Sequence, residues 1–316
     1  MSGGDERGLT EPLRVAVVGL GVIAPFYLAA LRNGGAARLA AVCDRDEQAL
    51  RSLRGRVPGY LDHRDLLRAG GFDAVVVTVP NDAHAEVCRD ALTTGVAVCV
   101  EKPLATVLSE GAALVRGARA RGLTLFTVCH RRYNAAVTAL IRTLASGPPI
   151  DSVTIRYRER IEDHVGRDRW YLDPARCGGG CVADNGPNAY DLAHLLVGPV
   201  RVTGAEVARD AHGVDRQARV LLQAHSGARV RVELDWSYPG ECKDIEVRLV
   251  DGTVHRADLL HDHPGFKQSL WHEYDAALAD FVAAVRSGAP RTDGGLAVLS
   301  LVQDTYRIEQ PLREGR

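Results

Sequence analysis

The sequence has no apolar run long enough to cross a bilayer. Its longest runs, near 75–79 and 96–100, have the length of single strands, whereas a membrane helix needs about 20 apolar residues. A net charge is also missing, because 39 basic and 40 acidic residues leave a formal charge of -1. These absences exclude a membrane span, and they give no electrostatic reason to expect a nucleic acid or an anionic membrane as a partner.

The chain also lacks a hydrophobic signal region at its start. Residues 1–11 are polar and glycine-rich, with acidic side chains at Asp5, Glu6 and Glu11. This composition predicts a disordered tail and not a secretory leader, so we expect a cytoplasmic protein.

The cysteines do not form a disulfide pattern. There are seven, an odd number, and they are scattered along the chain, several inside predicted strands. Buried reduced thiols explain this better than disulfides do. Cys177 and Cys181 have a spacing that a metal could use, but no second Cys or His pair accompanies them at zinc-site spacing, and His261 and His263 lack further ligands. We therefore expect no bound metal.

The first part of the chain alternates short Val/Ala-rich runs with helical stretches. This pattern is typical of βαβ units that build a parallel sheet, and the apolar runs fit strands that are buried on both faces. It predicts an α/β fold, a doubly wound Rossmann domain over 12–130. Its strands are expected at 14–18, 38–43, 74–79, 96–100 and 124–129.

After residue 131 the pattern changes to period-two alternation. A helix is expected near 135–146 and further helices at 273–286 and 295–308. One-sided strands are expected at 152–161, 201–209, 217–224, 228–236 and 244–250. The sequence thus predicts a second, α+β domain over 131–316, built on an open and mainly antiparallel sheet. Its last helices are free to pack back on the first domain.

A glycine motif follows the first predicted strand. Residues 19–24 read Gly-Leu-Gly-Val-Ile-Ala, which is G-x-G-x-x-A. Gly19 permits a tight turn, Gly21 lets the backbone approach a pyrophosphate, and Ala24 lets helix and strand pack closely. Val22 and Ile23 stand at the helix start, whose free N–H groups attract phosphate. The motif predicts dinucleotide binding.

An acidic residue supports the same prediction. Asp44 ends the second predicted strand, roughly 20 residues after the motif, where a carboxylate bonds the adenosine ribose hydroxyls. A carboxylate there repels a 2′-phosphate, which favours NAD. NADP also fits, since Arg45 partly offsets the repulsion.

Three further segments carry a family resemblance: Thr78–Asn81 with His84, Glu101–Pro103, and Gly178–Gly180 running into Asp184–Asp191. In this order they resemble the Gfo/Idh/MocA oxidoreductases, which include glucose–fructose oxidoreductase and inositol dehydrogenase. The resemblance implies hydride transfer between NAD(P) and a secondary alcohol or ketone of a sugar, nucleotide sugar or cyclitol, bound between two domains. It also implies a homodimer or homotetramer that associates through the second sheet.

The resemblance also implies roles for single residues. Lys102 is similar to the family's active-site lysine, and Asp184 to the carboxylate of the second-domain catalytic motif. Cofactor contacts are implied for Pro80, Asn81, His84, Glu101, Lys102 and Trp170. Independently of the family, Lys102 is one of only three lysines and follows the predicted strand 96–100 at its carboxyl end, where α/β sheets bind ligands.

One position departs from the family pattern. Many relatives have a histidine acid/base four residues after the motif's aspartate, whereas this chain has Asn188. Asparagine cannot act as a general base, but it can hydrogen-bond a substrate hydroxyl or carbonyl. The replacement candidates are Lys102 with a lowered pKa, which we place first, and then Asp184, Tyr190 and His164. For Asp184 the alternative is to hold Lys102 as an ion-pair partner.

For several residues a structural role competes with a functional one. We expect Tyr190 to pack in the core and His164 to be a solvated loop residue. For Trp170 and Tyr171, a place in the lining of the cleft and ordinary aromatic packing are equally expected. Residues 131–133 resemble an arginine-rich hinge, structural first and substrate-binding second.

Two other functions remain open at this point. An imine or alkene reductase needs no strong base, so Asn188 would only orient its substrate. A non-catalytic NAD-binding sensor would also explain the missing histidine, although it would need neither Lys102 nor Asp184.

Overall fold

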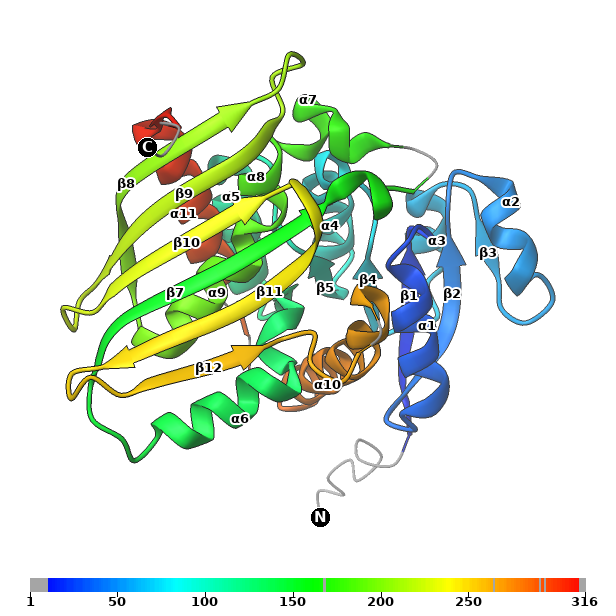
Figure 1. The fold of residues 1–316 in the computed structure, drawn as a ribbon. Helices are drawn as coiled ribbons and strands as arrows, with labels where there is room; N and C mark the ends of the chain where they lie inside the picture. The colour runs from blue at the N-terminus through cyan, green and yellow to red at the C-terminus, as the bar shows by residue number, and fades with distance from the viewer. Residues whose placement is uncertain (1–10, 167–168, 264, 290, 293, 313–316) are drawn as a thin grey trace.

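The computed structural model describes residues 11–312, except 167, 168, 264, 290 and 293. Apart from Glu11, the predicted tail over 1–11 lies outside the described residues. Among the helices that are described, none is long and apolar enough to cross a membrane. Figure 1 shows two parts side by side, a parallel sheet surrounded by helices and a broad twisted sheet.

Six parallel strands form the first sheet, in the order β3-β2-β1-β4-β5-β6. This order is that of a doubly wound Rossmann domain, which confirms the predicted fold class. The strands are β1 (Leu13–Val18), β2 (Ala37–Cys43), β3 (Gly59–Tyr60), β4 (Ala74–Val77), β5 (Ala97–Glu101) and β6 (Leu125–Val128). The helices are α1 (Ala24–Asn33), α2 (Glu47–Leu50), α3 (His63–Ala69), α4 (His84–Thr93) and α5 (Leu108–Ala120).

The central strands are buried because helices cover both faces of this sheet. β4 and β5 are buried at every position, which explains why each reads as a continuous apolar run. The strand expected at 74–79 ends earlier, at Val77, because the chain turns there and the Thr78 hydroxyl bonds the carbonyl of Gly19 at 2.6 Å. The two-residue strand β3 was not predicted, since so short a segment carries no periodicity.

The second sheet has the order β12-β11-β7-β10-β9-β8-β13. Its strands are β7 (Ile150–Arg160), β8 (Val200–Arg209), β9 (Asp215–Ala224), β10 (Arg229–Asp235), β11 (Ser237–Leu249), β12 (Val254–Asp258) and β13 (Gln310–Pro311). Neighbours are antiparallel, as predicted, except that β10 runs parallel to β7 and β13 parallel to β8. The alternation of apolar and polar residues shows which side chains share a face of a sheet, but it does not show which strands pair. The two parallel pairs and strand β12 were therefore not predicted.

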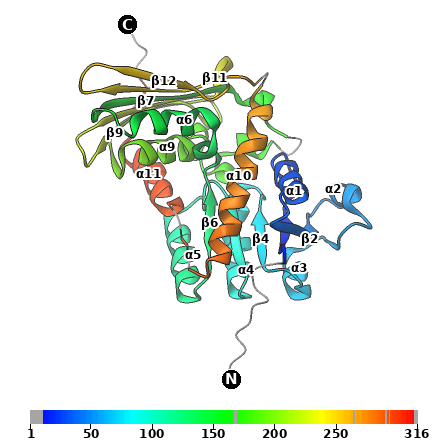
Figure 2. The same ribbon diagram turned by 90° about the horizontal axis from the view of Figure 1, so that it is seen from below.

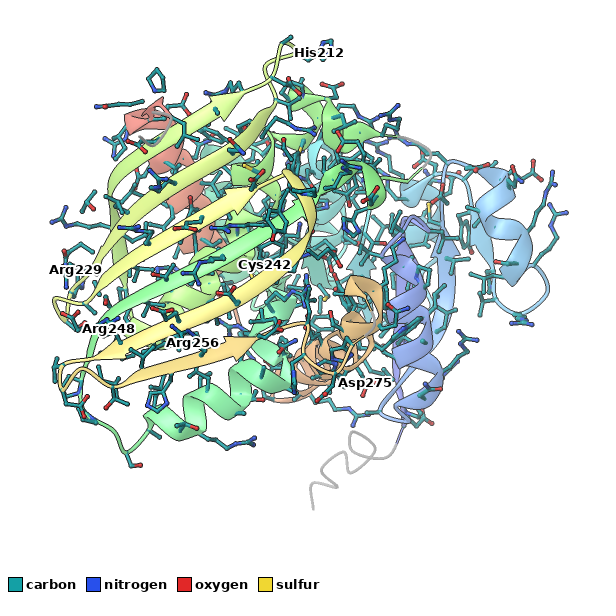
Figure 3. The ribbon with its side chains drawn as sticks, viewed as in Figure 1. His212, Arg229, Cys242, Arg248, Arg256 and Asp275 are labelled. Atoms are coloured by element: carbon teal, nitrogen blue, oxygen red, sulfur yellow. The ribbon has the colours of Figure 1, made fainter. Side chains whose placement is uncertain are left out.

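In the part of the chain that the structure describes, helices cover one face of this sheet and not the other (Figure 2). The covering helices are α6 (Ala135–Leu144), α8 (Cys181–Asp184), α9 (Gly186–Val197) and α11 (Gly295–Ile308). The second half of the chain also contains α7 (Pro174–Cys177) and α10 (Phe266–Arg286). On the uncovered face Figure 3 shows Cys242 and Arg248 of β11 and Arg256 of β12, while the alternate residues of β11, such as Val247, are buried.

The last two helices connect the domains. In α10, Tyr274 stacks on Phe26 with ring centroids 5.4 Å apart, and Phe281 lies 5.9 Å from Phe126. Helix α11 contributes Leu299 to the first domain's core and other residues to the second. α10 begins at Phe266 and not at the expected residue 273, because its polar first turn hides the helical periodicity. Both helices therefore pack back on the first domain.

Candidate active site

A cleft of about 880 Å³ lies between the two domains, at the carboxyl ends of the first domain's strands. Open α/β sheets bind ligands at this edge. Every predicted site residue lines this cleft: Gly19, Gly21, Val22, Ile23, Asp44, Arg45, Pro80, Asn81, His84, Glu101, Lys102, Trp170, Asp184 and Asn188. The second domain adds further polar side chains, among them Glu159 and His164.

The glycine loop has the shape that a dinucleotide requires. Gly19 has φ +95°, and a Cβ atom there would lie 2.6 Å from the carbonyl carbon of Thr78, so only glycine fits. A Cβ on Gly21 would meet nothing within 4 Å, and this residue is exposed to the cleft. Among the described residues no side chain caps α1, but its second residue is a proline without an N–H, and the N–H of Phe26 donates to the carbonyl of Ile23 at 3.1 Å. The open space at Gly21 is therefore the feature that a pyrophosphate can approach.

Asp44 is fixed beside this loop. One carboxylate oxygen accepts from the backbone N–H of Leu20 at 2.6 Å and the other from the N–H of Asp46 at 2.8 Å. A carboxylate has about four lone-pair positions, so each oxygen keeps capacity for a ribose hydroxyl. The loop and the acid together fit an adenine dinucleotide.

Two polar residues after β4 form hydrogen bonds with neighbouring loops beside the cleft. The side-chain amide of Asn81 donates to the carbonyl of Cys177 at 2.9 Å, a bond between the domains. His84 is fully buried, with its ring nitrogens 2.7 Å from the carbonyl of Pro103 and 2.9 Å from that of Val79. Burial lowers the pKa of His84. His84 therefore ties the loops after β4 and β5 together, and a polar contact with the cofactor would have to replace one of these bonds.

Lys102 and Asp184 meet across the domains. The Lys102 ammonium donates to the carbonyl of Asp184 at 3.0 Å and also pairs with its carboxylate. Burial lowers the pKa of Lys102 and is the largest single effect. The charge of Asp184, its hydrogen bond and the contributions of Tyr171 and Glu101 together outweigh burial, so the pKa is raised. The expected lowering of this pKa is therefore wrong. In this geometry Lys102 is a protonated donor, able to stabilise negative charge on a reacting oxygen.

Glu101 lies beside Lys102 and away from solvent. It accepts a hydrogen bond from the Tyr27 hydroxyl at 2.7 Å. Burial raises the pKa of Glu101 to about 7, even though Tyr27 and Lys102 favour the ionised form. A carboxyl group that changes its protonation near neutral pH therefore adjoins the lysine.

Asn188 contacts His130, which in turn contacts Glu273, and the sequence analysis missed both of these residues. Its Nδ2 atom lies 3.2 Å from Nε2 of His130, whose Nδ1 lies 2.5 Å from a carboxylate oxygen of Glu273. Burial lowers the pKa of His130 to about 4. Burial of Glu273 is the largest single effect and would raise its pKa. The charge of Arg131 and the contacts with His130 and Asn134 together outweigh burial and lower the pKa to about 2. The available signal was the place of His130, which follows β6 as Lys102 follows β5.

The remaining candidates divide between core and cleft. Tyr190 is fully buried, with its hydroxyl 2.8 Å from that of Thr305, which confirms the packing role. His164 is not solvated as expected: it lines the cleft, its side chain is 18% exposed, and its Nε2 lies 2.9 Å from Glu241. Trp170 and Tyr171 stack on each other and both line the cleft.

The arginines of the hinge have structural partners. Arg132 makes a two-pronged contact with Asp191 at 2.9 and 2.6 Å. Arg131 is fully buried and donates to Glu273 at 2.8 Å and to Ser269 at 3.1 Å. These bonds agree with the structural role that was placed first.

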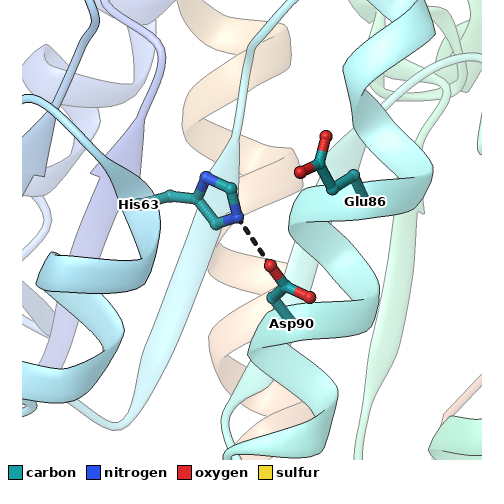
Figure 4. Close-up of side chains that lie close together, drawn as sticks. All are labelled: His63, Glu86 and Asp90. Atoms are coloured by element: carbon teal, nitrogen blue, oxygen red, sulfur yellow. Dashed lines mark hydrogen bonds and ion pairs between the residues drawn. The ribbon is translucent and has the colours of Figure 1, made fainter.

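Two groups among the described residues have metal-ligand side chains close together: His63 with Glu86 and Asp90, and Glu159 with His164 and Glu241. Figure 4 shows the ring of His63 pointing to Asp90, with Glu86 beside them. Arg64 pairs with both carboxylates of this group. The ammonium of Lys243 lies 2.6 Å from Glu159 in the other. A protein cation already pairs with both carboxylates of each group.

Comparison with known proteins decides the family. Residues 13–130 match the Gfo/Idh/MocA oxidoreductase family with its NAD-binding Rossmann fold, and residues 135–255 match the C-terminal domain of the same family. The chain belongs to the Gfo/Idh/MocA family. It is thus an NAD(P)-dependent oxidoreductase. The predicted family, the predicted nicotinamide cofactor and the prediction that the protein is an enzyme are confirmed. This result argues against a non-catalytic sensor.

Family members of known name share much of this chain. D-xylose 1-dehydrogenase (NADP(+)) 2 from Haloferax volcanii is 32% identical over 241 residues, covering 75% of this chain and 73% of that protein. D-apiose dehydrogenase from Paraburkholderia graminis is 28% identical over 337 residues, covering 95% and 88%. The crystal structure of GenD2 from gentamicin A biosynthesis, in complex with NAD, superposes with a TM-score of 0.85 at 25% identity and covers 94% of both chains.

Proposed function

We propose that this protein transfers a hydride between NAD(P) and a secondary alcohol or ketone of a sugar, nucleotide sugar or cyclitol. The observation that carries the proposal is the buried Lys102–Asp184 pair, which shares one cleft with the glycine loop and Asp44. The names of the relatives, a D-xylose and a D-apiose dehydrogenase, support the substrate class.

The residues take distinct roles in this proposal. When bound, the nicotinamide supplies or accepts the hydride. Lys102 donates a hydrogen bond to the reacting oxygen and stabilises its developing negative charge. Asp184 holds the ammonium in place and keeps it protonated. In ketone reduction the carbon receives the hydride and Lys102 gives a proton to the oxygen, whereas oxidation would need a neutral Lys102 to take that proton. Because Lys102 is protonated, we place reduction before oxidation. Asn188 orients the substrate and takes up no proton.

The cofactor preference follows from Asp44. Its carboxylate is held at the loop by two backbone N–H groups and would repel a 2′-phosphate, whereas Arg45 is exposed and has room to move. We therefore propose NAD as the preferred cofactor and NADP as a weaker one.

The proposal is tested in two steps with the purified protein. Fluorescence titration with NADH establishes cofactor binding, and a panel of pentoses, hexoses, cyclitols and their ketones is then screened for a change in nicotinamide absorbance. We expect turnover of at least one polyol or ketone, and its loss in Lys102→Ala with NADH binding preserved. Turnover that survives in Lys102→Ala would remove this lysine from the mechanism. If the protein binds NADH and turns over imines alone, the alternative function of an imine reductase is favoured.

We also propose that the protein is a homodimer or homotetramer joined through the uncovered face of the second sheet. That face carries rows of paired charges, such as Arg156 with Asp244 at 2.8 Å and Arg158 with Glu233. Light scattering of the eluting protein should give a multiple of the chain mass, and Arg158→Glu should weaken the assembly. A monomer at micromolar concentration would contradict the proposal.

A further inference from the structure

The carbonyl oxygen of Asn188 is buried and, among the described residues, has no hydrogen-bond partner. Asn188 itself lines the cleft. Buried polar atoms are nearly always paired, so an unpaired one in a binding cleft points to a ligand that completes it.

The orientation of this amide is fixed by its neighbour. An ionised carboxylate can only accept, so the contact between Glu273 and Nδ1 of His130 places the ring proton on Nδ1. Nε2 of His130 then carries a lone pair and accepts from Nδ2 of Asn188. If the amide turned over, its oxygen would face that lone pair, so the turned form is disfavoured.

Glu273 is itself held from two further sides. Arg131 donates to it at 2.8 Å and Asn134 at 2.6 Å. The imidazole of His130 also stacks on Tyr274, with ring centroids 5.1 Å apart. The tautomer of His130 is therefore set by a buried network of protein groups.

Asn188 stands close to the reacting groups in the fold. It follows Asp184 by four residues across the junction of α8 and α9, where the backbone stays helical. Residues four apart in a helix lie on the same face. Asn188 therefore shares its side of the cleft with Asp184, which holds Lys102.

We propose that Glu273, His130 and Asn188 form a substrate-reading array that presents the Asn188 carbonyl as an acceptor. This inference rests on the proposed function and names a feature of its substrate. The group that meets Asn188 must donate a hydrogen bond, while Lys102 donates to the reacting oxygen. A ketone oxygen cannot donate, so the donor is a hydroxyl or amino group on the carbon next to the reacting one. His130 is a positioning residue that acts through Asn188.

The array itself can be read without substrate. Nitrogen-15 spectra of protein labelled at histidine should show His130 with Nδ1 protonated and Nε2 bare at neutral pH. Asn188→Asp puts a carboxylate against Nε2, and the pKa of His130 should then rise. A charged or Nε2-protonated His130 in the wild-type protein would overturn the proposal.

Selectivity is measured on the same panel of sugars and cyclitols. Each member is paired with the deoxy analogue that lacks the hydroxyl next to the reacting carbon. We expect wild-type kcat/KM to favour the hydroxylated member by at least about tenfold, and Asn188→Leu and His130→Phe to bring the ratio close to one. His130→Gln, which can still accept from Asn188, should restore part of it.

An unchanged ratio in Asn188→Leu would overturn the proposal. If no member of the panel is turned over, the result counts against the proposed function. The nitrogen-15 spectra of His130 would then still show whether the array exists.

Discussion

The ammonium of Lys102 donates to the backbone carbonyl of Asp184 at 3.0 Å as well as to its carboxylate. The lysine comes from the first domain and the aspartate from the second, so the reacting groups are assembled only when the two domains are packed together. A mutation of the aspartate side chain leaves the carbonyl contact available. The charge of Lys102 can therefore be altered without removing its anchor.

Asp184→Asn is expected to move the pH dependence of turnover. In the wild-type protein the pKa of Lys102 is raised, so the lysine stays protonated through the neutral and mildly alkaline range. Without the carboxylate the charge that opposes burial most strongly is lost, so the pKa of Lys102 falls. The rate of ketone reduction should decline at high pH in both proteins, and the decline should begin at a lower pH in the variant. The pH–rate profiles of the two proteins measure this shift. Coincident profiles would mean that Asp184 does not control the charge of Lys102.

Gly19→Ala and Gly21→Ala form a matched pair in the glycine loop. A methyl group at Gly19 meets the backbone of Thr78 and must adopt φ +95°, so we expect a loss of roughly 1–3 kcal/mol in unfolding free energy together with weaker NADH binding. At Gly21 the methyl group meets no protein atom and only narrows the space for the pyrophosphate. This variant should have the melting temperature of the wild type, but it should bind NADH at least about tenfold more weakly than the wild type. Equal melting temperatures and equal affinities for both variants would contradict the assigned loop geometry.

Asp44→Ala tests the choice of cofactor. The variant loses the acceptor for the ribose hydroxyls and the charge that repels a 2′-phosphate, while the neighbouring Arg45 remains. NADH affinity should fall and NADPH affinity should hold or rise, so that the preference shifts by about tenfold or more toward NADPH in fluorescence titrations. Asp46→Ala changes a nearby carboxylate that lacks this place in the motif and serves as the control. A parallel loss of both nucleotides would show that Asp44 supports the loop without selecting the cofactor.

The sequence was most informative where one local rule decides the structure. Strands β4 and β5 are buried on both faces, so their apolar runs could be recognised directly, and the glycine motif located the cofactor end of the cleft. Contacts between distant residues were harder to predict. Glu273 stands 143 positions after His130, and nothing in the sequence indicated their contact. An ion pair between Asp184 and Lys102, 82 positions apart, was the alternative role expected for Asp184, and the structure has it. The pKa of Lys102 was nevertheless assigned the wrong direction, because an acid/base role of the lysine was placed before this ion pair.

The buried imidazole of His130 should make the protein sensitive to acid. An unfolded histidine has a pKa of about 6.5, whereas burial lowers the pKa of His130 to about 4. Between these values the unfolded chain binds more protons, so a falling pH favours unfolding. The stability that comes from the neutral ring is fully present above about pH 6.5 and is lost as the pH falls toward about 4.

His130→Phe removes this titration and keeps an aromatic ring against Tyr274. The variant should be less stable at every pH, because Glu273 and Asn188 each lose a partner. Its unfolding free energy should nevertheless fall less between about pH 7 and about pH 5, by about 2 kcal/mol, than that of the wild type. Urea titrations at both pH values measure that difference. An equal fall in both proteins would place the acid sensitivity elsewhere, for example at the buried His84, and would contradict a neutral His130 in the folded state.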